Sequence, residues 1–206
     1  MNPHQVTRDF EEALCDYTGA PLAVATTSCT MAITLALAWK LRNRDEYKFD
    51  YEVEMPKLSY VGVPAAIRNA GAFPYFRNED WQGEYEFGGC VDGVWDSARR
   101  FTSGMYRPGA MQCVSFHWSK ILGLSQGGAI LLGDMDAYQW LRRARFDGRT
   151  EGVDAKHDQV QYPSWHAYLS PEVAAHGLMK LSLLPKHNAD LPRSDYPDLS
   201  TLEAFK

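Results

Sequence analysis

The chain has 206 residues, of which 45% are hydrophobic and 13% aromatic. This length suits one ordinary domain or a modest domain with a tail, and the composition supplies enough apolar side chains for a packed core. The formal net charge is −5. Proteins that grip nucleic acid chiefly through phosphates carry a basic excess, so a nucleic-acid partner is disfavoured. A small acidic surplus still permits an anionic substrate held by a few local cations.

The four cysteines lie far apart in the sequence and form no Cys-x-x-Cys pair. This spacing argues against a zinc knuckle, so we expect reduced thiols and no metal site. The first residues lack the apolar core of a secretory signal, and no run of about 18 apolar residues could span a bilayer. We therefore expect a soluble cytoplasmic protein without a membrane partner.

The N-terminal third reads as helix, strand, polar turn and helix. Residues 7–17 are predicted to be helical and are ended by the Gly-Ala-Pro sequence at 19–21. Residues 22–25 form an apolar strand, 26–30 a polar turn, and 31–41 a helix that is apolar almost all round and therefore buried. This order is typical of the first half of a βαβ unit.

Strands and helices continue to alternate after a charged stretch at 42–48. Strands are predicted at 51–55, 73–76, 93–95, 111–116 and 129–132, helices at 63–69, 137–145 and 171–184, and a loop at 88–93. Beyond Pro185 the sequence is polar and proline-rich. The pattern predicts an α/β three-layer sandwich with a mainly parallel, mixed sheet over residues 1–184, followed by an extended C-terminal tail over 185–206.

Lys120 is the first candidate for chemistry, because it follows an apolar strand and lies among aromatic residues. Partial desolvation there favours the neutral amine, which can attack a carbonyl group. The alternative is an ordinary surface lysine on a loop. Its sequence context therefore has to decide between the two interpretations.

Two further features supply that context. Asp96 closes a short strand, where its carboxylate could face a ligand at the sheet edge or simply cap the residues that follow. The hydroxyl-rich turn Ser28-Cys29-Thr30 begins a helix, and such a terminus suits a phosphate group. Serine and threonine also cap many helices that bind no ligand.

Taken together, the motifs of this chain occur in the order found in a known family. The chain resembles the DegT/DnrJ/EryC1/StrS family of fold-type I enzymes that use pyridoxal phosphate (PLP), mostly sugar aminotransferases, over about residues 20–180. The matching stretches are Ser28-Cys29-Thr30-Met31-Ala32-Ile33, residues 56–67 with the aromatic Tyr60, Asp96-Ser97-Ala98-Arg99, Ser115-Phe116-His117-Trp118-Ser119-Lys120, Gly127-Gly128-Ala129 and Asp147-Gly148-Arg149.

The resemblance implies a role for each matching residue. Lys120 would form the Schiff base with PLP and move protons during catalysis, and Asp96 would pair with the ring nitrogen. Tyr60 would stack on the ring, although a core tyrosine is an equally good interpretation of that residue alone. The phosphate would be held by Ser28, Cys29, Thr30 and Ser115.

The sequence also departs from the family pattern. Proteins of this family are usually much longer and carry a small C-terminal domain. This chain is therefore expected to be a reduced aspartate-aminotransferase-like large domain that lacks most of that small domain. The stretch between Asp80 and Asp96 is too short for the usual elements, so a parallel strand is expected to be missing there.

Two substitutions affect the expected cofactor site. Arg99 replaces the family's His or Gln, and its side chain could contact the cofactor or an anionic substrate, or point to solvent. His166 aligns with an asparagine that reaches the phosphate of the partner subunit. His166 could keep that contact across a homodimer or be purely structural.

The resemblance therefore implies a PLP-dependent transaminase, working as a homodimer with a shared active site. It would move an amino group from glutamate or glutamine to a keto-sugar nucleotide by a ping-pong Schiff-base mechanism. One alternative is a PLP enzyme with another acceptor, such as a modified nucleobase. Another is a non-catalytic binding protein or partner subunit derived from the family.

Overall fold

The computed structural model describes residues 4–43, 51–162, 164–192 and 195–205. Most of the charged stretch predicted at 42–48 lies outside these ranges. Among the described residues, no helix is both long and apolar enough to cross a membrane. All four cysteines are free thiols, as the sequence predicts.

The N-terminal helix–strand–helix unit is confirmed. Helix α1 (Gln5–Thr18) ends at Gly19, whose φ of 77° is a left-handed conformation that glycine adopts without strain. Strand β1 (Leu22–Thr26) leads into helix α2 (Cys29–Leu41). Ser28 caps α2, because its side chain accepts a hydrogen bond from the Met31 amide at 3.1 Å.

The remaining predicted helices and strands are also present, with ends that shift by one or two residues. The strands are β2 (Glu52–Pro56), β3 (Phe73–Arg77), β6 (Val94–Asp96), β7 (Met111–Ser115) and β8 (Gly128–Leu132). The helices are α3 (Gly62–Asn69), α4 (Met135–Ala144) and α5 (Pro171–Leu183). Two short strands were not predicted, β4 (Tyr85–Glu86) and β5 (Gly88–Gly89), the second of which lies where a loop was expected.

The strands are arranged in mixed sheets, with fewer parallel pairs than the sequence suggested. One sheet has the order β1-β8-β7-β6-β4 and the other β3-β2-β5. Among the strand pairs of the described residues, β2–β3 and β6–β7 are parallel, whereas β1–β8, β7–β8, β4–β6 and β2–β5 are antiparallel. Strand β8 is antiparallel to β7 because no helix lies between them to carry the chain back across the sheet.

The two sheets meet in the segment 85–89, where Phe87 alone separates β4 from β5. This segment pairs antiparallel with β6 on one side and with β2 on the other. It therefore occupies the stretch where the sequence predicted a missing parallel strand. The side chains of Tyr85 and Phe87 are buried in the core.

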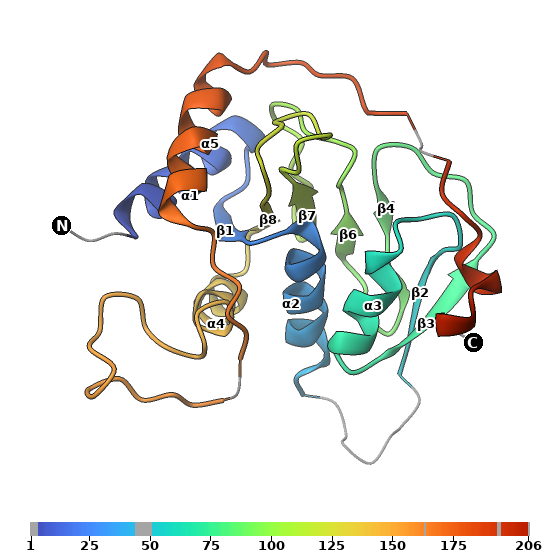
Figure 1. Cartoon of the computed structure of the whole chain (residues 1–206), viewed down its shortest axis with the longest axis horizontal. Coiled ribbons are helices and arrows are strands. Elements are labelled where there is room, and N and C mark those ends of the chain that lie inside the picture. The colour runs from blue at the N-terminus through green and yellow to red at the C-terminus, as the bar shows by residue number, and fades with distance from the viewer. Residues whose placement is uncertain (1–3, 44–50, 163, 193–194, 206) are drawn as a thin grey trace.

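Two layers of helices cover the sheet, one on each face (Figure 1). Neighbouring strand residues alternate between two hydrophobic clusters: Val24 and Ile130 pack with α2, α3 and α4, whereas Ala25 and Ala129 pack with α1 and α5. Helix α5 fits closely on α1 at Gly177, where a Cβ atom would lie 2.7 Å from the ring of Phe10. The expected three-layer α/β sandwich is thus confirmed.

The segment after α5 crosses the molecule toward strand β3 (Figure 1). It makes specific contacts on the way: the Asn188 side-chain amide donates to Tyr17 Oη at 2.8 Å and to the Phe101 carbonyl at 3.1 Å. Leu199, in a short 3₁₀ helix (Leu199–Thr201), is fully buried in the core that α2 and α3 share. A second 3₁₀ turn (Glu203–Phe205) packs Phe205 against Phe76.

Candidate functional site

A cavity of about 360 Å³ lies where α2 and α3 begin and where β6 and β7 end. Pockets for small molecules are commonly about 300–1,000 Å³. Eight of the nine site residues predicted from the sequence line this cavity, namely Ser28, Cys29, Thr30, Tyr60, Asp96, Arg99, Ser115 and Lys120. The ninth, His166, does not line it.

The start of α2 gives the cavity a seat for an anion. The amides of Cys29 and Thr30 are the first two of the helix, so neither has an acceptor within the helix. They add to the positive end of the helix dipole. Gly128 of β8 lets this turn approach closely, because a Cβ atom there would collide with the backbone of Ser28 and Cys29. Burial raises the pKa of the Cys29 thiol well above its usual range, so Cys29 can serve a ligand through its amide and not as a thiolate.

Lys120 and Ser115 reach the cavity from the end of β7. Ser115 is buried, and the chain then turns so that the Lys120 amide donates to the His117 carbonyl at 2.8 Å. The Lys120 side chain is half-buried and close enough to Asp96 to lower the pKa of that carboxyl. Of the aromatic residues that precede the lysine in the sequence, Trp118 is 72% exposed, whereas Phe116 is fully buried.

Asp96 is a buried carboxylate in the wall of the cavity. Burial raises its pKa, while hydrogen bonds from the Ala98 amide and from Tyr85 Oη, at 3.0 and 2.9 Å, act in the opposite direction. The charges of Lys120 and Arg99 also lower it. The Ala98 bond fits the expected capping turn, and the same carboxylate also lines the cavity.

Tyr85 is a functional residue that the sequence interpretation missed. It lies opposite Asp96 in the β4–β6 pairing, and its hydroxyl bonds to both Asp96 and Ser59 at 2.9 Å. Burial raises the pKa of Tyr85 well above 10, so the hydroxyl remains protonated and can donate to the carboxylate. The alternation of charged and aromatic residues in Glu84-Tyr85-Glu86-Phe87 could have revealed this strand.

Arg99 points into the protein and not to solvent, which decides between the interpretations left open by the sequence. Its side chain is 9% exposed and lines the cavity. The guanidinium donates to Tyr196 Oη at 3.2 Å and to the carbonyl of Pro192. Tyr196 itself lines the cavity, so the C-terminal segment supplies part of the wall.

Tyr60 lies at the rim of the cavity, just before α3. It is 55% exposed, so it is not the core tyrosine that the sequence left as an alternative. A Cβ atom at Gly62 would come within 2.7 Å of the Tyr60 ring. The glycine therefore allows the ring to lie close to the first turn of α3, facing the cavity.

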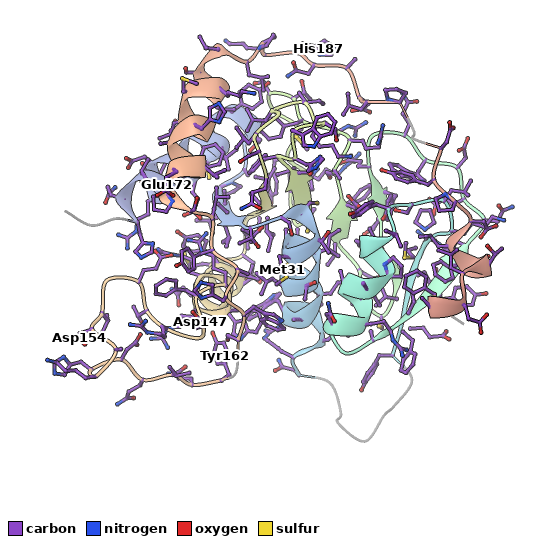
Figure 2. All side chains as sticks on the ribbon, viewed as in Figure 1. Met31, Asp147, Asp154, Tyr162, Glu172 and His187 are labelled. Carbon is purple, nitrogen blue, oxygen red and sulfur yellow. The ribbon has the colours of Figure 1, made fainter. Side chains whose placement is uncertain are left out.

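His166 lies outside the cavity of this chain. Its exposed ring forms a hydrogen bond through Nδ1 with Asp147 Oδ2 at 2.7 Å. Asp147 follows α4 in a peripheral loop, whereas Met31 marks the first turn of α2 (Figure 2).

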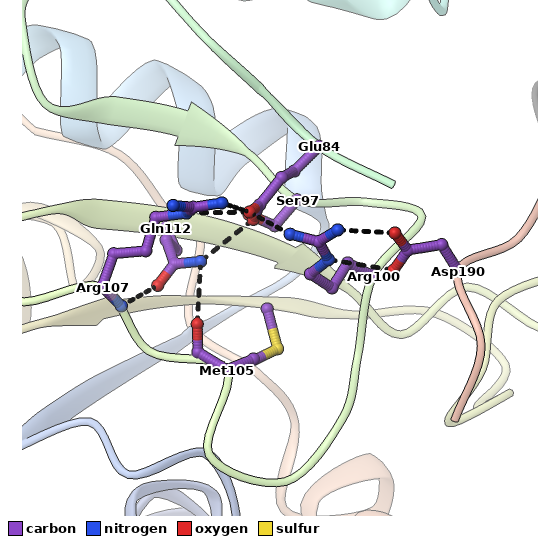
Figure 3. A network of polar contacts seen from close by, with 7 residues as sticks. All are labelled: Glu84, Ser97, Arg100, Met105, Arg107, Gln112 and Asp190. Atoms are coloured by element: carbon purple, nitrogen blue, oxygen red, sulfur yellow. Dashed lines mark hydrogen bonds and ion pairs between the residues drawn. The ribbon is translucent and has the colours of Figure 1, made fainter. Parts of the chain in front are cut away.

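A polar network fixes the backbone beside Asp96 and Arg99 (Figure 3). At its centre is the buried carboxylate of Glu84, which pairs with Arg100 and Arg107 and accepts from Ser97 Oγ at 2.7 Å. Arg100 also holds Asp190 through two hydrogen bonds of 2.9 and 2.6 Å. The network joins β4, the end of β6 and the C-terminal segment into one support.

The donor set of the cavity fits PLP. A phosphate would be received by the start of α2, and Lys120 is the amine that could bond to an aldehyde. Asp96 is a carboxylate kept away from water, as needed to hold a protonated ring nitrogen, and Tyr60 offers an aromatic face. These groups come from α2, α3, β6 and β7, so the fold and not a single motif brings them together.

Comparison with known proteins agrees with this arrangement. The model of the DegT/DnrJ/EryC1/StrS aminotransferase family matches residues 2–82 and confirms the resemblance in that part of the chain, which includes Ser28–Thr30 and Tyr60. No curated protein matches the chain.

Solved structures of aminotransferases share the fold. The aminotransferase PseC of Helicobacter pylori, involved in the biosynthesis of pseudoaminic acid, has a TM-score of 0.70 at 20% identity, over 86% of this chain and 57% of that one. A sugar aminotransferase from Micromonospora echinospora has a TM-score of 0.69 at 18% identity, over 86% and 60%. A DegT DnrJ EryC1 StrS aminotransferase from Brucella abortus has a TM-score of 0.68 at 17% identity, over 87% and 58%. The chain thus has their α/β fold and spans less than two thirds of their length.

Proposed function

We propose that this chain binds PLP through Lys120 and uses it to transfer an amino group. The observation that carries the proposal is the shared cavity, which joins Lys120, the buried Asp96 and the start of α2. Each group alone has an ordinary structural explanation. Their convergence in a space of about 360 Å³ matches the amine, carboxylate and anion seat that this cofactor needs.

Different residues bind the phosphate and the ring of the cofactor. Ser28, Thr30, Ser115 and the first amides of α2 hold the phosphate. Asp96 keeps the ring nitrogen protonated, and Tyr85 supports it by donating to the carboxylate. When bound, the cofactor supplies an electron sink that stabilises negative charge on the substrate carbon.

Lys120 and Tyr60 act on the reacting side of the cavity. The Lys120 amine attaches the cofactor and, once displaced by the amino donor, accepts and returns the proton of the substrate carbon. Tyr60 lies at the rim, where its ring can cover one face of the cofactor and exclude water from it. Lys120 follows β7, and Tyr60 precedes α3.

The substrate class of the proposal is an amino acid donor, glutamate or glutamine, and a keto-sugar nucleotide acceptor. It is supported by the sugar aminotransferases among the proteins of the same fold and by a cavity open enough for a small molecule. The proposed assembly is a cytoplasmic homodimer, in which His166 of one copy could reach the phosphate bound by the other.

The proposal is tested by titrating the purified chain with PLP and recording its visible spectrum. A lysine-bound pyridoxal band should appear in the wild type and be absent in Lys120→Ala. Lys180→Ala is the matched control. The Lys180 side chain, on α5, donates to the carbonyl of Gly123 in the loop that carries Lys120, but it does not line the cavity. If the band is absent from the wild type, or equally strong in Lys120→Ala, the proposal is wrong.

The transfer step is tested separately. Addition of glutamate or glutamine to the loaded protein should convert the lysine-bound band to the spectrum of the aminated cofactor, and a keto-sugar nucleotide should restore it. If a different class of ketone restores the band, the proposal of PLP-dependent transfer stands, but the acceptor is that ketone and not a keto-sugar nucleotide. Failure of every amino donor to change the spectrum would contradict aminotransferase activity.

A further inference from the structure

A second cavity, of about 750 Å³, is lined mainly by α4 and by the loop that follows it. We call it the α4 cavity. Its described lining shares no residue with the described lining of the cavity that contains Lys120. Both cavities touch α2, but at opposite ends, because the helix rises by about 14 Å from Thr30 to Trp39. In Figure 2, Met31 marks the first of these ends, whereas Tyr162 lies beside the loop after α4.

A stack of aromatic rings forms part of the wall of the α4 cavity. The ring centroids of Trp39 and Trp140 are 5.7 Å apart, and Tyr162 stacks on Trp140 at 5.5 Å with 13° between the ring planes. The Tyr162 hydroxyl donates to the Trp140 carbonyl at 3.2 Å, which holds the ring in this position. Among the described residues, Trp140 is the one ring stacked on Tyr162, so a flat ligand can continue the stack.

The α4 cavity has a positive excess, although the formal net charge of the chain is −5. The charged side chains of its described lining are Arg8, Arg142, Arg143, Arg149, Asp136 and Glu151. Arg8 and Arg142 both pair with Glu151. Arg149 pairs at 3.9 Å with Asp158, a residue that does not line the cavity.

Arg143 carries the charge that these pairs leave uncompensated. None of the ion pairs between described residues involves it; its partner is the neutral Thr150, whose Oγ1 accepts from the guanidinium at 2.7 Å. This bond sets the direction of the guanidinium and engages one of its five N–H groups. Burial raises the pKa of Tyr162, and the charge of Arg143 acts in the opposite direction, so the guanidinium lies near the end of the aromatic stack.

A flat ring beside an oriented arginine suits a ligand that has both an aromatic ring and an anionic group. The volume of the cavity lies in the range of small-molecule sites. The exposed side chains of Gln139 and Gln161 also line it, and a carboxamide can both donate to and accept from hydroxyl groups. Arginine binds phosphate oxygens through two parallel hydrogen bonds. A nucleoside diphosphate offers a base, sugar hydroxyls and phosphates to these three kinds of group.

We infer that the α4 cavity binds a nucleoside diphosphate, with the base stacked on Tyr162 and the phosphates bound by Arg143. The inference goes beyond the proposed function, because amino transfer at Lys120 uses none of these residues. It also gives the loop after α4 a role, since this loop supplies both the stacking ring and the hydroxyl of Thr150 that orients the arginine.

The test is a calorimetric titration of the full chain with ADP as the probe. The wild type should bind ADP at least about tenfold more tightly than adenosine or pyrophosphate, because each of these lacks one half of the ligand. Arg143→Gln should weaken ADP binding by at least about tenfold, as expected for loss of hydrogen bonds from a charged group. Tyr162→Leu should weaken it by about tenfold through loss of the stacked ring.

Two controls separate binding from folding. Arg68→Gln changes an exposed arginine of α3 that does not line the α4 cavity, and should leave the ADP affinity unchanged. Tyr162→Phe keeps the ring and loses the hydroxyl, so it should bind ADP within about twofold of the wild type, while Tyr162→Leu does not. If Tyr162→Leu does not fold, the comparison of ADP with pyrophosphate still tests the ring contact.

The inference is overturned if the wild type does not bind ADP, or if Arg143→Gln binds it as tightly as the wild type does. It is also overturned if adenosine or pyrophosphate binds as tightly as ADP, since the site would then recognise one half of the ligand only. Labelling of Lys120 by PLP is measured on the same samples. If Lys120 is not labelled but ADP binding depends on Arg143, the proposed function fails and the nucleotide site stands. If Lys120 is labelled and ADP binding ignores Arg143, only the present inference fails.

Discussion

At the scale of single residues, hydrogen bonds from groups outside the cavity set the properties of the side chains that line it. Asp96 faces the cavity, but its ionisation depends on Tyr85 and the Ala98 amide, which donate to its two oxygens. Burial acts against the charged form, and these donors favour it. The balance between them decides over which pH range the carboxylate can hold a protonated ring.

Replacement of Tyr85 by Phe should therefore change the pH dependence of the proposed reaction. The variant keeps the ring but removes the donor to Asp96 Oδ2, so the pKa of Asp96, already raised, rises further. Because the reaction needs the ionised carboxylate, its acid limb should move to higher pH. The measurement is the rate of the donor half-reaction against pH, and an unchanged acid limb would contradict the role given to Tyr85.

Arg99 shows which information at this scale is not present in a sequence. The motif placed it three residues after Asp96, but its direction depends on Pro192 and Tyr196, which are almost a hundred residues away. Lys120, Asp96 and Ser28 could be predicted because local patterns place them at strand ends and at a helix start. Tyr196 carries no local signal of this kind.

At the scale of elements, a cluster of buried ion pairs ties the long loop after α4 to the helices. Glu151 of this loop pairs with Arg145 at 2.8 Å and Arg142 at 2.5 Å, and Arg145 also pairs with Glu11 of α1. Burial alone would raise the pKa of Glu151, but Arg145 and Arg142 outweigh it and lower the pKa to about 2. These ion pairs attach the loop to α1 and α4.

This cluster predicts a defined loss of stability in acid. The pKa of Glu151 falls on folding, so its contribution is complete above the unfolded value of 4.5 and is lost as the pH drops toward 2. Glu151→Gln should lower the free energy of unfolding at neutral pH by about 3 kcal/mol. Urea unfolding from neutral pH to about pH 2 should show the two proteins converging. A constant difference across this range would contradict the assignment.

The elements that sequence reasoning found and missed differ in what stabilises them. Helix α2 and strand β1 carry their own signals, a serine cap and an apolar run. Strands β4 and β5 have two residues each and exist because β6 and β2 lie on either side. The pairing of β5 with the distant β2 cannot be read from its two glycines, so the loop predicted at 88–93 was partly wrong.

At the scale of the whole molecule, the C-terminal segment is part of the folded body. Its polar, proline-rich composition predicted a tail, yet Asn188, Asp190 and Leu199 each bond to or pack on the domain. Composition describes what a segment can do alone, and here its order comes from contacts with α1, β6 and the core. Residues of the C-terminal segment thus help to hold the cavity wall in place.

Truncation of Leu199 tests this coupling. Leu199→Ala removes a fully buried side chain and should cost about 2–5 kcal/mol of unfolding free energy. Leu183→Ala is the matched control, because that leucine is 78% exposed and its loss should change stability by less than about 0.5 kcal/mol. Equal effects in urea unfolding would mean that the segment does not pack on the core in solution.

The central claim is that Lys120 carries the cofactor, and chemical trapping tests it most directly. The purified chain is incubated with PLP, reduced with borohydride and digested, and the modified peptide is identified by mass spectrometry. We predict that the modification maps to Lys120 and to no other lysine at comparable yield. Modification spread over several lysines, or confined to one outside the cavity, would contradict the account.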